Sequence, residues 1–128
     1  MMKIICVSNN PIIINKKLPQ VQVINGGFLD VLEKAKDKIL KGYKLVTHPL
    51  TGSISPQVMP YKSIILESGP GQVDDESLQI INLAIAYARS LIQLDPRLCW
   101  DEASLTDFQL IDFDFVKDMI AMLHPSKI

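Results

Sequence analysis

The sequence predicts an α/β layered domain with a small, mostly parallel sheet of about four strands flanked by helices. Three observations predict this class. Short apolar runs rich in β-branched residues alternate with longer helical patterns, the connections between them are mostly short, and no internal repeat or low-complexity stretch interrupts the order. The 128 residues are enough to bury a substantial core, so we expect residues 1–128 to form a single domain.

The first strand is predicted at residues 3–8, KIICVS, because a continuous apolar run suits a strand that is buried on both faces. An Asn-Asn-Pro sequence ends it, and a short helical or irregular piece follows. A second, shorter strand, VQVIN, is predicted at 21–25. Cys6 is expected to point into the core, where a thiol behaves as a small hydrophobic group.

An amphipathic helix is predicted after Gly26 and Gly27, with apolar side chains at spacings of four, three and four. An acidic residue near its start and lysines near its end agree with the helix dipole. Gly42 is placed to end this helix. Its buried stripe is expected to contain Phe28, Leu32, Ala35 and Ile39.

The third and fourth strands are predicted at 43–48 and 63–68. The segment between them contains no helical pattern, although a parallel connection normally needs a crossover helix. We therefore expect the fourth strand to run antiparallel, or to return at the sheet edge. Strand order 2-1-3-4 is the simplest arrangement that keeps the crossovers right-handed.

A long helix is predicted from a cap at Asp74 or Asp75 to about Leu94. It carries only a narrow polar stripe, so it must be covered on more than one side. The sheet covers one side, and the C-terminal segment or a second copy of the protein covers another. The second possibility predicts a homodimer through the 75–94 helix.

The C-terminal part is predicted to contain a short helical piece at 101–109, an apolar link at 110–111 and a last helix at 114–123. Asp112 lies among alternating aspartates near the start of that last helix, which are more often caps than metal ligands. Trp100 is expected to fill the core beneath the junction of the helices.

Charge and cysteine content argue against several function classes. The chain has 13 basic and 14 acidic residues and a net charge of −1, too little to gather nucleic acid or an anionic membrane. No stretch approaches the roughly 18 continuous apolar residues that span a bilayer. The two cysteines form no CxxC pair and have no nearby histidine, so no zinc site is expected. We expect a soluble, intracellular protein without a nucleic-acid or membrane partner.

Polar residues follow the first and third predicted strands, at 8–10 and 47–49. Open α/β sheets bind ligands beyond the carboxyl ends of their strands, at the point where the strand order reverses. The loop at 47–63 therefore starts where this fold usually places ligands. The side chains expected to form a polar pocket for a carboxylate or phosphate are Ser8, Asn9, Thr47, His48, Ser53, Tyr61, Lys62 and Ser63.

His48 is the one weak catalytic candidate, as a general acid or base. The alternative is a strand-end histidine held by a backbone carbonyl. Lys62 offers a point charge for an anion, or it is simply a solvated lysine entering an edge strand. No GxSxG, HExxH, GxGxxG or P-loop motif is present, so no recognised catalytic constellation, metal or cofactor is expected. His124, near the end of the last helix, receives no functional role.

The segment KLVTHPLTGSISPQVMPYKSIIL, together with DFQLID, resembles the GrdX-like family, small proteins encoded with the glycine, sarcosine and betaine reductase systems of amino-acid-fermenting anaerobes. The resemblance covers most of the chain in order. It implies cytoplasmic residence and a role accessory to a reductase complex with selenoprotein components. It brings no established activity, catalytic residue or cofactor. The matching positions are Thr47, His48, Pro49, Gly52, Ser53, Pro60, Tyr61, Lys62 and Ser63.

Three functions follow as hypotheses. The first is an accessory or regulatory protein that binds a reductase component or a small anionic metabolite at the 47–63 loop. The second is a small enzyme for a carboxylate or phosphate substrate, with His48 as acid or base and Lys62 holding the anion. The third is a homodimeric structural or interaction protein, in which the loop serves only as structure.

Overall fold

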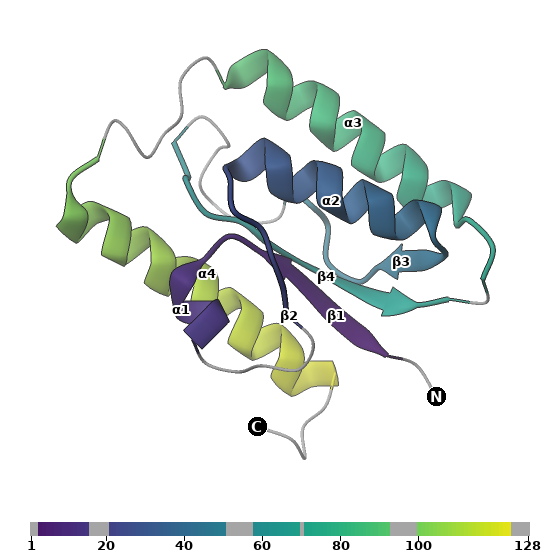
Figure 1. Ribbon diagram of the computed structural model, residues 1–128, viewed down its shortest axis with the longest axis horizontal. Helices are drawn as coiled ribbons and strands as arrows, with labels where there is room; N and C mark the ends of the chain where they lie inside the picture. Colours follow the sequence, from purple (N-terminus) through teal and green to yellow (C-terminus); the bar gives the residue numbers. More distant parts are fainter. Residues whose placement is uncertain (1–2, 16–20, 51–57, 70, 93–99, 124–128) are drawn as a thin grey trace.

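The computed structural model describes residues 3–15, 21–50, 58–69, 71–92 and 100–123. Within these residues, helices surround one four-stranded sheet (Figure 1). In chain order the elements are β1 (Ile4–Ser8), α1 (Pro11–Asn15), β2 (Val21–Val23), α2 (Phe28–Leu40), β3 (Tyr43–Leu45), β4 (Ser63–Ser68), α3 (Asp75–Leu91) and α4 (Glu102–Leu123).

The sheet has the strand order β2-β1-β4-β3. β1 pairs with β2 in parallel, whereas β4 runs antiparallel to both β1 and β3. The predicted fold class, an α/β domain with a four-stranded sheet flanked by helices, is confirmed, and so is the antiparallel direction of β4. The order differs from the expected 2-1-3-4 because β4 lies between β1 and β3, and the pairing is mixed.

The difference in strand order has a simple physical cause. β4 begins with four consecutive buried residues, whereas all three residues of β3 are only half-buried. A strand that is apolar on both faces is stabilised most in the centre of a sheet, and a strand carrying a lysine, here Lys44, suits an edge. The long apolar run Ile64-Ile65-Leu66 was therefore a sign of a central strand.

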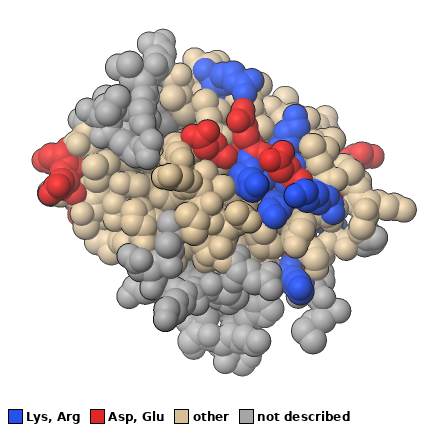
Figure 2. Space-filling model, viewed as in Figure 1, with Lys and Arg blue, Asp and Glu red and all other residues tan. Residues whose placement is uncertain are grey.

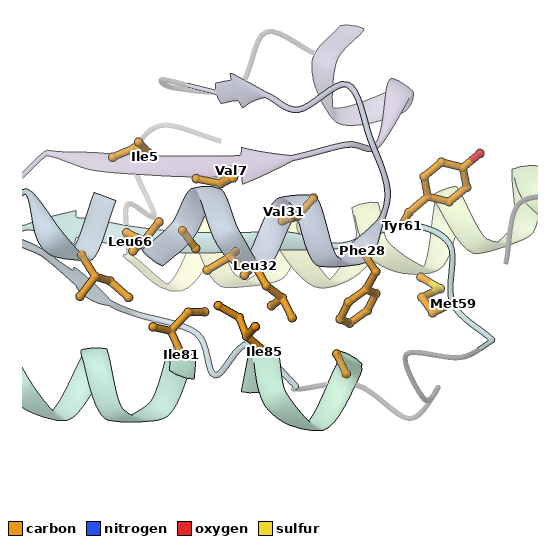
Figure 3. Packing of buried hydrophobic residues seen from close by; sticks show 14 residues of the cluster. Ile5, Val7, Phe28, Val31, Leu32, Met59, Tyr61, Leu66, Ile81 and Ile85 are labelled. Carbon is orange, nitrogen blue, oxygen red and sulfur yellow. The ribbon is translucent and has the colours of Figure 1, made fainter. Parts of the chain in front are cut away.

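Two apolar clusters cover the two faces of the sheet, because successive side chains of a strand point to opposite faces. On one face, Ile5 and Val7 of β1 pack with α2 and α3, and Figure 3 shows Leu32 of α2 between the sheet and Ile81 of α3. On the other face, Cys6 and its neighbours pack against α1 and α4. The predicted inward position of Cys6 is confirmed, since only 1% of it is exposed.

Helix α2 begins and ends as the sequence predicts. The Asp30 carboxylate accepts a hydrogen bond from the Gly27 backbone N–H (2.7 Å) at its start. Gly42, just past its end, has a φ of +103°, which only glycine adopts without strain. The predicted buried stripe is confirmed, and Val31 joins it.

The C-terminal part differs from the prediction, because α4 is one continuous helix of 22 residues. The expected link at 110–111 is helical, and Asp112 lies inside the helix, so its predicted role as a cap near a helix start is wrong. Trp100 is 39% exposed and does not fill the core. Its ring contacts Phe108 edge-on at 5.3 Å, and its indole N–H donates to the Val58 carbonyl (3.1 Å).

Helix α3 ends at Leu91, three residues before the expected end. Its start is as predicted, because the Asp74 carboxylate accepts hydrogen bonds from the backbone N–H and the hydroxyl of Ser77. No helix among the described residues is long and apolar enough to cross a membrane.

Candidate functional site

A buried polar cluster lies where β1 ends and β4 begins, facing α4. The Ser8 and Ser63 hydroxyl oxygens are 2.8 Å apart, since these residues are paired across the two strands. The Ser63 hydroxyl donates to the Asp112 carboxylate at 2.6 Å. Three segments far apart in sequence therefore meet through side chains that are almost fully buried.

Asn10 ties the same cluster to the backbone of α4. Its side-chain N–H₂ donates to the Asp112 carboxylate (3.0 Å) and to the Gln109 carbonyl (2.8 Å). Its backbone N–H donates to the Ser8 hydroxyl (3.0 Å), and its side-chain oxygen accepts from the Ile12 N–H at the start of α1 (3.1 Å). One asparagine thus connects β1, α1 and α4.

Asn9 performs a similar role on the other side of the strand end. Its N–H₂ group donates to the carbonyls of Gly26 (3.0 Å) and Pro60 (3.1 Å), and its oxygen accepts from the Lys62 N–H (2.9 Å). The loop before α2 and the segment before β4 are held together by this one side chain. Asn9 thus has a structural role at the rim of the sheet.

Tyr61 and Gln109 join the segment before β4 to α4. The Gln109 side-chain N–H₂ donates to the Tyr61 hydroxyl at 2.9 Å. The Tyr61 ring is buried and lies beside Met59 and Phe28 at one end of the larger apolar cluster (Figure 3). The Tyr61 hydroxyl therefore accepts a hydrogen bond from α4, while its ring packs in the apolar cluster that α2 and α3 cover.

The cluster is electrostatically unusual because it contains two buried ionisable groups. Burial raises the pKa of the Asp112 carboxyl, while the hydrogen bonds from Ser63 and Asn10 and the charge of Lys62 oppose that shift. Burial lowers the pKa of the Lys62 ammonium, and the Asp112 charge opposes it. The Lys62 ammonium lies 5.9 Å from the centre of the Phe28 ring.

Cys6 lies near the cluster and is chemically inert there. Burial raises the pKa of its thiol to about 12, the Asp112 charge adds to this effect, and a hydrogen bond with Ser63 opposes it. A thiol with so high a pKa forms almost no thiolate near neutral pH, so it is a poor nucleophile.

The structure brings together five of the eight predicted pocket residues. Thr47 is buried but takes part in the sheet, because its hydroxyl oxygen accepts from the Ile65 N–H (3.1 Å) just beyond the end of β3. His48 is exposed, and its Nδ1 accepts from the Leu50 N–H (3.1 Å). Ser53 lies outside the described residues, as does His124. The five that meet are Ser8, Asn9, Tyr61, Lys62 and Ser63.

Sequence reasoning missed three members of this cluster: Asn10, Gln109 and Asp112. Gln109 and Asp112 are three residues apart, so they share one face of a helix. That spacing would have indicated a buried polar pair only if residues 101–123 were predicted as one helix. In such a helix the Asp112 carboxylate lies on the same inward stripe as Val116. Asn10 was placed with Ser8 and Asn9 at the expected ligand-binding edge but was not included among the pocket residues.

The chemistry of the cluster is that of a closed network. Every buried side-chain nitrogen or oxygen among the described residues has a hydrogen-bond partner. No group of three or more metal-binding side chains is present in that part of the chain. No carboxylate within the described ranges hydrogen-bonds to His48, so the arrangement shows no base paired with an orienting acid.

A separate hollow of about 470 Å³ lies on the surface between α2 and α3. Arg89 of α3 and Glu33 of α2 form an exposed ion pair of 2.8 Å at it. Figure 2 shows basic and acidic side chains intermingled on the side of the molecule formed by these helices. An open, mixed-charge hollow of this kind favours no one sign of ligand.

Fold and site together define a small α/β protein whose polar cluster is satisfied by its own side chains. Residues 5–121 match the model of a family described as GrdX-like protein. The match spans most of the chain, so this protein belongs to the GrdX-like family, as its sequence suggested. Comparison with curated proteins and with solved structures gives no match.

Proposed function

We propose that this protein is an accessory component of glycine reductase-type systems that acts by binding a protein partner and has no turnover of its own. Membership of the GrdX-like family supports the association. The observation that carries the non-catalytic part is the closed hydrogen-bond network, because the buried polar groups of the described site are used to hold β1, β4 and α4 together.

The inertness of the ionisable groups supports the same proposal. A catalytic nucleophile or base needs a pKa matched to its task. Burial moves the Cys6 thiol to a pKa of about 12, which is the wrong direction for a nucleophile. The imidazole of His48 is exposed, and its Nδ1 accepts a hydrogen bond from the Leu50 backbone N–H two residues later, which is a local contact within the loop.

Affinity purification from an anaerobe that expresses the reductase tests the proposal. Tagged protein should recover reductase subunits, identified by mass spectrometry, and a tagged unrelated protein of similar size should not. Recovery of no reductase component under these conditions would overturn the proposed association. A substrate turned over by the pure protein, with activity lost in His48→Ala, would overturn its non-catalytic nature.

A small anionic metabolite is a second candidate ligand, favoured by the buried ammonium of Lys62. This charge lies beside Phe28, the first residue of α2, and positive helix ends and lysines both attract anions. A thermal-shift screen of carboxylates and phosphates tests it. Stabilisation by one compound that disappears in Lys62→Met, with the apo melting temperature accounted for, supports this candidate, and no stabilisation by any compound contradicts it.

The homodimer, one of the three functional hypotheses, is a separate proposal that rests on α3. Leu83 and Tyr87 lie one helical turn apart on its surface and are 65% and 50% exposed. Its first turn is acidic and its last turn carries Arg89, so two antiparallel copies would oppose unlike charges. Sedimentation equilibrium tests the homodimer. A wild-type dimer that becomes a monomer in the Leu83→Ser, Tyr87→Ser variant would support it. A wild-type protein that stays monomeric at high concentration would rule it out.

A further inference from the structure

The outer surface of α4 is apolar at positions where a solvent-facing helix is usually polar. Leu110 and Ile111 are 46% and 49% exposed, and Met122, three turns further along, is 74% exposed. Scattered exposed apolar residues are ordinary, but adjacent ones on one helix face mark interaction surfaces more often.

This exposure is a consequence of how α4 is attached to the sheet. Asp112 points inward to Ser63 and Asn10, and Val116 and Ile120, four and eight residues later, complete the same inward stripe. A rotation that buried Ile111 would break the Asp112 hydrogen bonds. The helix therefore keeps a carboxylate inside and an apolar pair outside, an inversion of the usual pattern that is typical of functional surfaces.

The apolar pair is surrounded by negative charge. Asp107 and Asp114 lie three or four residues from Leu110 and Ile111 on either side, and Asp118 lies one turn beyond, all exposed. The same stretch contains a single basic residue, Lys117, whose ammonium is 3.9 Å from the Asp114 carboxylate. Three carboxylates with one ammonium leave this face acidic.

We propose that this face docks a basic, amphipathic segment of the protein partner. We define the α4 face by the exposed side chains of residues 107–118, which are Asp107, Leu110, Ile111, Asp114, Lys117 and Asp118. Apolar side chains of the partner cover Leu110 and Ile111, and its lysines or arginines meet the aspartates. The inference rests on the proposed function and deepens it, because it names the surface and the chemistry of the segment that binds there.

The first test uses the purification described above with two matched variants. Leu110→Ser with Ile111→Ser removes the apolar centre of the α4 face, and Leu40→Ser with Val73→Ser removes two exposed apolar side chains elsewhere, at the end of α2 and before α3. Both variants are checked for an unchanged fold by circular dichroism. Recovery of the identified reductase subunits should fall at least about tenfold in the α4 variant and stay unchanged in the Leu40→Ser, Val73→Ser variant. Equal recovery by wild type and the α4 variant would overturn the inference.

The second test does not depend on the reductase, so the two proposals can fail separately. A fluorescent Leu/Lys peptide with helical spacing is titrated with the full chain, and a Leu/Glu peptide of the same spacing is the control. Wild type should bind the basic peptide, with affinity falling as salt rises and falling at least about tenfold in Asp107→Lys with Asp114→Lys. Equal affinity for both peptides, or no effect of the charge reversal, would overturn the acidic docking surface.

A second copy of the chain is the competing occupant of the α4 face. Sedimentation equilibrium of wild type and of the Leu110→Ser, Ile111→Ser variant distinguishes it. A monomer in both cases agrees with docking of a different partner. A wild-type dimer that this variant alone converts to monomer would show that the face pairs with itself and would overturn the inference.

Discussion

The Asp112 carboxylate and the Ser63 hydroxyl are joined by a buried hydrogen bond of 2.6 Å across 49 positions of sequence. The bond connects the middle of α4 to the first residue of β4. The same carboxylate oxygen also accepts from Asn10, which follows β1. Removing this one side chain would therefore loosen the contact of α4 with two strands.

Asp112→Asn should change how stability depends on pH. Burial raises the pKa of Asp112 in the folded state above its ordinary value of 3.8, so the folded protein holds this proton more tightly than the unfolded chain does. The stabilisation is complete below about pH 3.8 and is lost as the pH rises through the folded-state pKa. In urea unfolding, the free energy of unfolding of wild type minus that of Asp112→Asn should decrease as the pH rises above 3.8.

Asp112→Ala is the matched comparison. Both hydrogen bonds converge on one carboxylate oxygen, a place that the asparagine carbonyl oxygen can take but a methyl group cannot. The alanine variant leaves the Ser63 hydroxyl and the Asn10 amide without this acceptor, which should cost about 3 kcal/mol in the free energy of unfolding. A free-energy difference between wild type and Asp112→Asn that does not vary with pH would contradict the raised pKa of Asp112.

Cys6 should resist thiol reagents until the protein unfolds. With a pKa of about 12, only about one molecule in ten thousand carries the thiolate at pH 8, and the side chain is 1% exposed. A Cys99→Ser background isolates this thiol. Ellman's reagent should label it at the rate of global unfolding, and labelling of native protein as fast as of denatured protein would disprove its burial.

The architecture was largely predictable because its signals are local. The apolar run at 3–8 and the spacing of Phe28 and Leu32 indicate a buried strand and an amphipathic helix without reference to the rest of the chain. The position of β4 was not predictable from the right-handed crossovers that favoured the order 2-1-3-4. It depends on which strand gains most from burial on both faces, which is a competition between distant segments.

Gly42→Ala should destabilise the protein more than Gly71→Ala. Both glycines have positive φ, +103° and +92°, so both substitutions cost about 1 kcal/mol in backbone strain. A methyl group at Gly42 would also lie 3.1 Å from the Gly71 Cα, whereas nothing lies within 4 Å of one at Gly71. Thermal unfolding should give the lower midpoint for Gly42→Ala, and equal midpoints would mean that the turn relaxes without cost.

Thr47→Val should lower the free energy of unfolding by about 1 kcal/mol, with Thr47→Ser close to wild type. The Thr47 hydroxyl accepts the Ile65 N–H at 3.1 Å, beside the last backbone bonds between this segment and β4. Valine keeps the shape and removes the acceptor. Hydrogen exchange of the Ile65 amide reads out the same bond directly: faster exchange is expected in the valine variant alone, and unchanged exchange there would mean that the hydroxyl does not protect it.

The site was predictable only in part, for a reason visible in α4. Polar residues near strand ends, such as Ser8 and Lys62, could be assigned to one rim of the sheet from topology alone. Asp112 could not be assigned to this rim, because an aspartate near a predicted helix start is ordinarily a cap. Its side chain points inward because Ser63 and Asn10, which are distant in sequence, donate hydrogen bonds to it. His48 shows the converse, since its residue type suggested chemistry while its surroundings are those of an exposed loop.

A double-mutant cycle between Ser63 and Asp112 tests most directly whether the polar cluster is a structural clamp on α4. The free energies of unfolding of wild type, Ser63→Ala, Asp112→Ala and the double variant are measured at one pH. The closed network predicts that the sum of the two single losses exceeds the loss in the double variant by roughly 1–3 kcal/mol, because either substitution removes the same buried bond. Losses that add within about 0.3 kcal/mol would contradict it, since the two residues would then stabilise the protein independently.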